Sequence, residues 1–190
     1  MKNVVLLFLL ASLAITCSAG EKEDPRDLFL NNYLDYCGQA YSGETRFIDL
    51  GENHQLDGAS LVMVLEECSP EAVRIPFIVN GDSSRTWIVM QTPQGLYLTH
   101  DHRYPDGSQH ANNFYGGYAD ITGSGTRQYF PSDHRTILDR RVRAANLWSK
   151  EFDHENEIYY YRLYLEGELR YEAAFDLSVP MDAAFRDSQR

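Results

Sequence analysis

The sequence predicts a mostly β protein, a single antiparallel β-barrel or β-sandwich that begins with one helix. Three observations support this fold class. From Leu61 onward, apolar residues recur with a period of two, the spacing that places alternate side chains on one face of a strand. Turn residues interrupt these segments roughly every 8–12 positions, as they do in barrels and sandwiches. No internal repeat, low-complexity tract or linker divides the chain after its N-terminal segment.

The first twenty residues have the organisation of a secretory signal peptide. Met1–Asn3 provides a short positive start, and residues 4–14 form an apolar run too short to span a bilayer as a helix. Small residues follow, so cleavage after Ala19 or Gly20 would leave one domain over residues 21–190. The alternative, a buried N-terminal helix, is disfavoured because such helices usually keep a polar face. The segment therefore predicts export to the periplasm or the extracellular space.

The three cysteines fit an exported protein. Cys17 closes the apolar run where a lipoprotein would be cleaved and acylated, so a lipid anchor on Cys17 is the alternative to free secretion. The preceding residues match the lipoprotein consensus poorly, and free secretion is favoured. Cys37 and Cys68 then remain as an even pair, which usually forms a disulfide in an oxidising compartment. A nucleophilic role for Cys37 lacks a nearby base in the sequence.

Charge and length exclude several partner classes. The formal net charge is −11, and basic residues concentrate only between Arg135 and Arg143. Because phosphate-backbone binding needs a basic surface, nucleic acid and anionic membranes are poor partners. No second apolar run of membrane length follows the signal segment. About 170 residues remain after cleavage, enough for one domain with its own core.

The expected elements can be placed in order along the chain. A helix begins after the N-cap residue Asp24 and ends at Gly38. Strands follow at residues 61–65, at 73–79 and from Trp87 onward, with a turn at Asn80–Asp82 before the last of these. A short helix is expected around Arg135–Arg143. The apolar residues that recur at helical spacing in the first helix are Leu30, Tyr33, Leu34 and Cys37.

The C-terminal part is predicted to be a β-hairpin. Residues 159–165 and 169–175 each alternate between apolar and polar positions, and Glu166–Gly167 turns the chain between them. One antiparallel core is therefore expected to bury alternating residues from all these strands, among them Val73, Phe77, Val89, Leu163, Leu165, Leu169 and Phe175.

One predicted strand places polar side chains on the same face as core residues. Residues 95–104 form this strand, which ends at the turn Pro105–Gly107. The alternation marks its inward face by two leucines, and the same face continues toward the end of the strand. Both imidazoles are therefore expected where the core ends and a barrel mouth begins. The residues on this face are Leu96, Leu98, His100, His102 and Tyr104.

Two histidines at positions i and i+2 of a strand can bind one metal ion, and Asp106, His110 or His134 could supply a third ligand. With Gly95 upstream and an acid downstream, the spacing resembles the first motif of cupins. It has four rather than five residues between the glycine and the first histidine, and no second motif is legible around residues 125–134. Two interpretations stay open: structural histidines, which we favour, and a divalent-metal site formed by His100, His102 and Asp106.

Several motifs together resemble a group of uncharacterised secreted bacterial β-barrel proteins. The resemblance covers residues 35–180 and implies export and a fold similar to that of calycin-like barrels, which hold small apolar ligands. No activity is established for that group, so the resemblance implies no catalytic residue. The motifs are Arg74–Phe77, Ser84–Trp87, His100–Ser108, Tyr115–Gly117 and Gln128–Asp133, together with Cys37 and Cys68.

Three functions are compatible with these features. The favoured one is a non-enzymatic barrel that binds a small apolar ligand. A cupin-like metal-dependent enzyme is the first alternative, and an envelope module that docks a partner protein is the second. An unfilled interior would favour the first function, bound metal the second, and a closed barrel with an exposed apolar patch the third. The residues expected to bind the ligand at the barrel mouth are Arg85, Trp87, His100, His102 and Tyr104.

Overall fold

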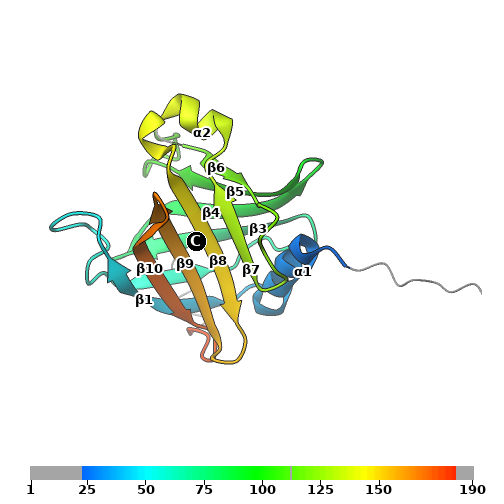
Figure 1. Ribbon diagram of the computed structural model, residues 1–190. Helices are drawn as coiled ribbons and strands as arrows, with labels where there is room; N and C mark the ends of the chain where they lie inside the picture. The colour runs from blue at the N-terminus through cyan, green and yellow to red at the C-terminus, as the bar shows by residue number, and fades with distance from the viewer. Residues whose placement is uncertain (1–22, 112, 183–190) are drawn as a thin grey trace, which may run out of the picture.

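The computed structural model describes residues 23–111 and 113–182 and shows one antiparallel sheet of ten strands, almost closed into a barrel (Figure 1). The mostly β fold class is therefore confirmed. The predicted signal segment and Cys17 lie outside the described residues. The strands are β1 (Ala40–Ile48), β2 (Leu61–Val64), β3 (Ala72–Val79), β4 (Asp82–Thr92), β5 (Gly95–His102), β6 (Tyr115–Tyr118), β7 (Arg127–Pro131), β8 (Asn146–Asp153), β9 (Ile158–Leu165) and β10 (Glu168–Asp176).

Two meanders build the barrel. The strand order is β6-β5-β4-β3-β2-β1-β10-β9-β8-β7, so the first six strands form one meander, the last four form another, and β1 pairs with β10. The strands β6 and β7 border the remaining seam. Across it, the Asp133 amide donates to the Gly116 carbonyl at 2.9 Å, and the Asp120 amide donates to the Tyr129 carbonyl at 2.9 Å. These bonds bring the two edges of the sheet together.

The glycines of β6 make this seam possible. A Cβ atom on Gly116 would lie 1.8 Å from the Leu98 carbonyl oxygen in β5, and one on Gly117 would lie 1.8 Å from the Pro131 carbonyl oxygen in β7. Both distances are far below van der Waals contact, so these positions require residues without a side chain. The Tyr115–Gly117 motif is thus explained by close backbone approach.

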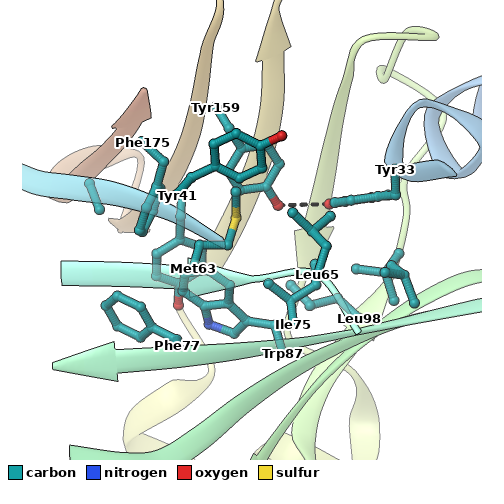
Figure 2. Packing of buried hydrophobic residues seen from close by; sticks show 14 of the residues in the cluster. Tyr33, Tyr41, Met63, Leu65, Ile75, Phe77, Trp87, Leu98, Tyr159 and Phe175 are labelled. Atoms are coloured by element: carbon teal, nitrogen blue, oxygen red, sulfur yellow. Dashed lines mark hydrogen bonds between the residues drawn. The ribbon is translucent and has the colours of Figure 1, made fainter. Parts of the chain in front are cut away.

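The predicted N-terminal helix closes one end of the barrel. In α1 (Pro25–Asn32), the Asp24 side chain caps the first turn by accepting from the Arg26 amide at 2.8 Å. The chain continues as the 3₁₀ helix η1 (Tyr33–Tyr36) and turns at Gly38, whose φ is +78°. Phe29 and Tyr33 are fully buried, and the Tyr33 and Tyr159 hydroxyls share a hydrogen bond of 2.7 Å (Figure 2).

Two-residue turns fix the register of two hairpins. Asn80 and Gly81 have φ values of +52° and +84°, and Glu166 and Gly167 have +54° and +83°, as type I′ turns require. Both turns were predicted from the sequence. The strand after Asn80–Gly81 begins at Asp82 rather than at Trp87, because a turn this short leaves no loop.

The expected core is confirmed for four of the seven positions and wrong for three. In β3, Val73 and Phe77 are buried, as is Phe175 in β10. Leu163, Leu165 and Leu169, however, are only partly buried, although Leu163 packs against the core. The pairing of β9 with β10 shifts between Leu169 and Tyr171, so the alternation that begins in the middle of β10 does not continue to the end of this hairpin.

Aromatic side chains fill the middle of the barrel. The Phe77 and Trp87 rings stack with their centroids 4.4 Å apart (Figure 2), and the Tyr161 ring lies 4.4 Å from that of Trp87. Phe175 and Met63 pack into the same cluster. Among the described residues, these side chains thus occupy the middle of the barrel.

A disulfide joins Cys37, just after η1, to Cys68, between β2 and β3. The sequence separation of 31 residues corresponds to a stabilisation of about 3 kcal/mol in the chain-entropy model. The bond ties the N-terminal helix to the barrel and is typical of an oxidising compartment. Separately, the described part of the chain contains no helix that is long and apolar enough to span a membrane.

Candidate functional site

The end of the barrel opposite α1 contains a pocket of about 310 Å³. Its walls come from β4, β5, β8 and β9 and from the connection between β1 and β2. The connection between β7 and β8 covers this end with the short helix α2 (His134–Asp139) and the 3₁₀ helix η2 (Arg141–Arg143) (Figure 1). The pocket is therefore formed by residues that are distant in the sequence.

The structure places four of the five predicted ligand-binding residues in this pocket. In the β4–β5 pair, Arg85 lies opposite His102 and Trp87 lies opposite His100, and all four line the pocket. Tyr104 does not line it. The strand ends at His102, and the Tyr104 ring, 47 % exposed, stacks on the His110 ring at 3.9 Å.

Both ring nitrogens of His100 are engaged. The Nδ1 atom lies 3.0 Å from the Tyr115 carbonyl oxygen, which can only accept, so Nδ1 carries the proton. The Nε2 atom then accepts from the Tyr161 hydroxyl at 3.0 Å. Burial holds the pKa of His100 well below its usual value, so the ring is neutral at pH 7. His100 thus positions two tyrosines, and neither of its ring nitrogens has a free lone pair.

His102 is neutral as well. Burial is the main cause that lowers its pKa to about 4, and the nearby positive charges of Arg85 and Arg143 add to the effect. Its Nε2 atom and the Tyr115 hydroxyl share a hydrogen bond of 3.0 Å. Its backbone amide donates to Asn113 Oδ1 at 2.7 Å, which anchors the end of β5.

The structure does not bring a third metal ligand to the two histidines. Asp106 is exposed, and its carboxylate accepts from the amide and hydroxyl of Ser108 in its own turn. His110 stacks on Tyr104, and His134 is exposed at the start of α2. Within residues 23–111 and 113–182, no group of three or more His, Cys, Asp or Glu side chains could hold a metal ion.

Sequence reasoning missed Arg143, which comes from η2. Its guanidinium carbon lies 3.4 Å from the centroid of the Tyr115 ring, and its Nη1 atom is buried with no hydrogen-bond partner among the described residues. Burial lowers the pKa of Arg143, but a guanidinium stays protonated near neutral pH. The only sequence signal was the run of basic residues from Arg135 to Arg143. The local sequence pattern does not indicate which of these side chains faces the pocket.

The pocket is positively charged in a strongly acidic chain. Arg85 is partly neutralised by Asp82, 3.1 Å away, whereas Arg143 forms no ion pair with a described residue. No Asp or Glu lines the pocket, although the formal net charge of the chain is −11. Trp87 and Trp148 provide flat apolar walls. This arrangement combines an unpaired cation with aromatic surface.

No protein-family model, curated protein or solved structure matches this chain. The site is therefore interpreted from its own geometry.

Proposed function

We propose that the protein is a non-enzymatic binding barrel whose mouth holds a small organic anion with a flat, apolar body. The observation that supports this most directly is the pocket that has two arginines and no carboxylate in its lining. A volume of about 310 Å³ fits a small ligand, since such sites occupy about 300–1,000 Å³. The sequence predicted a small apolar ligand. The ligand proposed here has such an apolar body and also carries an acidic group.

Arg143 is the residue expected to bind the acidic group. Its buried Nη1 atom lacks a hydrogen-bond partner among the described residues, and an unsatisfied buried donor is costly. A carboxylate can accept from a guanidinium through two parallel bonds, which satisfies this donor and neutralises its charge. Arg85 is held by Asp82 and by Gln55, 2.9 Å away, and adds positive potential on the opposite wall.

The remaining polar groups favour binding over catalysis. His100 uses both ring nitrogens in hydrogen bonds to tyrosines, and His102 uses Nε2 in the same way. A general base must reach the proton that it removes, and these nitrogens are already occupied. We therefore assign the histidines to hold Tyr115 and Tyr161 in the pocket wall.

We further propose that the protein acts outside the cytoplasm. Support comes from the Cys37–Cys68 disulfide, from the signal-like residues 1–20 and from the resemblance to secreted bacterial barrels. The pocket is small and concave, a shape that suits a free metabolite better than a permanent protein partner.

Calorimetry with benzoate and with benzamide, its uncharged counterpart, tests the proposal. Wild-type protein should bind benzoate, or a larger aromatic carboxylate, more tightly than the matched amide. Arg143→Gln should weaken carboxylate binding about 10- to 100-fold, since a charge-assisted hydrogen bond contributes about 1.5–3 kcal/mol. Arg135→Gln, which removes an exposed arginine of α2, is the matched control. Equal affinity for acid and amide, or an unchanged affinity in Arg143→Gln, would overturn the proposal.

A further inference from the structure

After residue 22, the chain contains a single lysine, Lys150. The sequence contains Lys2, Lys22 and Lys150, and its other basic residues are arginines. Lys150 is fully buried, at 0 % exposure, on the inward face of β8 between Trp148 and Phe152. Arginine is the cation that proteins cannot deprotonate, whereas a buried lysine loses its proton readily. The one lysine after residue 22 thus occupies a position where burial favours the neutral amine.

The amine of Lys150 is surrounded by aromatic rings. Its Nζ atom lies 3.6 Å from the centroid of the Trp87 ring, 4.9 Å from that of Tyr161 and 5.4 Å from that of Tyr159. It has no hydrogen-bond partner among the described residues. Burial holds the pKa of Lys150 well below its usual value, so more of this amine is neutral near pH 7 than of an exposed lysine. A neutral amine retains the lone pair that makes it a nucleophile.

Lys150 lies next to the pocket, behind its floor. Trp87 and Tyr161 line the pocket and also contact the space around Nζ. Lys150 itself does not line the pocket, so a flat ligand beside these rings has to displace one of them to reach the amine. The mouth is the direct route, because α1 closes the other end of the barrel with Phe29 and Tyr33.

We propose that Lys150 captures an aromatic or other apolar aldehyde that enters through the pocket, by forming an imine. The Nζ lone pair attacks the carbonyl carbon, and a C–N bond forms as the C=O π bond opens. The carbinolamine then loses water: its oxygen leaves with the two hydrogens of the amine, and a C=N bond results. No electrons are gained or lost, so no oxidant or reductant is required. This reversible covalent capture goes beyond anion binding and does not need Arg143.

Reductive trapping tests the capture. Native protein is incubated with benzaldehyde at pH 7.5 and treated with sodium borohydride, and the modified residue is identified by peptide mass analysis. The expected result is a benzyl adduct on Lys150 that forms at least tenfold faster than on an acetylated lysine amide in the same solution. A solvated lysine amine of this kind is only about 0.1 % neutral at this pH, which is why it serves as the reference.

Four variants make the outcome decisive. Lys150→Met and Lys150→Arg should lose this adduct, and Arg135→Gln, which removes an exposed arginine of α2 outside the pocket lining, should keep it. Trp87→Phe should raise the rate of labelling, since a smaller ring widens the floor of the pocket. Labelling of Lys150 only in urea, or no faster in the native protein than the labelling of the lysine amide, would overturn the proposal without affecting the anion site.

Discussion

At the scale of single residues, Lys150 shows how burial decides the charge of a group. Its ammonium form would gain about 2 kcal/mol from the Trp87 ring in a desolvated site. Removal of an ion from water costs several kcal/mol even after the protein relaxes, and no described carboxylate pairs with Nζ. Desolvation is the larger effect, so it lowers the pKa of Lys150, and protonation of the buried amine opposes folding.

We predict that Lys150→Met stabilises the protein by about 1–4 kcal/mol at pH 7, the range seen when buried charges are replaced by apolar residues. The folded-state pKa of Lys150 is lowered, so between that pKa and 10.5 the unfolded chain binds more protons. The wild-type free energy of unfolding should therefore rise with pH, by up to about 1.4 kcal/mol per unit relative to Lys150→Met. Urea unfolding at pH 7, 8 and 9 measures this difference. Parallel pH profiles would contradict it.

His100 affects how the free energy of unfolding declines on the acid side of neutral pH. Its pKa is lowered in the folded state, so its contribution is present above about pH 6.5 and is lost as the pH falls toward the folded-state value. His100→Phe should flatten the decline of unfolding free energy between pH 7 and pH 5, although it also removes two hydrogen bonds and lowers stability overall. Substitution of the exposed His134 by Gln is the control. An unchanged acid slope in His100→Phe would refute the assignment.

At the scale of elements, local pattern predicted the strands better than the site. Period-two alternation was sufficient for β3, and positive-φ turns were sufficient for the hairpins at Asn80–Gly81 and Glu166–Gly167. Tyr104 was wrongly predicted to lie at the barrel mouth, because β5 ends two residues earlier, at His102. There the Asn113 side chain accepts a hydrogen bond from the His102 amide. Arg143 was missed because η2 follows a break in the helix after α2, and only the folded chain brings it over Tyr115.

The seam between β6 and β7 gives a prediction at this scale. Gly117→Ala should destabilise the protein by several kcal/mol, because its Cβ atom would overlap the backbone of Pro131. Gly107→Ala, at a φ of +81° but in open space, should cost only about 1–2 kcal/mol. Chemical unfolding of both variants tests the order. A Gly117→Ala variant as stable as Gly107→Ala would mean that the barrel is not closed at this seam.

At the scale of the whole molecule, the two ends of the barrel have different roles. Phe29 and Tyr33 seal one end, rings around Trp87 fill the middle, and the pocket remains at the other end. The sequence predicted a barrel with a polar mouth. It could not show that the interior is filled, because this depends on which rings from distant strands meet. The predicted apolar cavity is thereby reduced to a small site whose charge comes from η2.

Intrinsic fluorescence provides the most direct measurement of the central claim, that the mouth binds an organic anion. The chain has two tryptophans, Trp87 and Trp148, and both line the pocket. Titration with an aromatic carboxylate that does not absorb at the excitation wavelength should change their emission saturably. The matched amide should act only at concentrations about 10- to 100-fold higher, and Arg143→Gln should abolish the difference. Emission that responds equally to acid and amide, or to neither, would contradict the account.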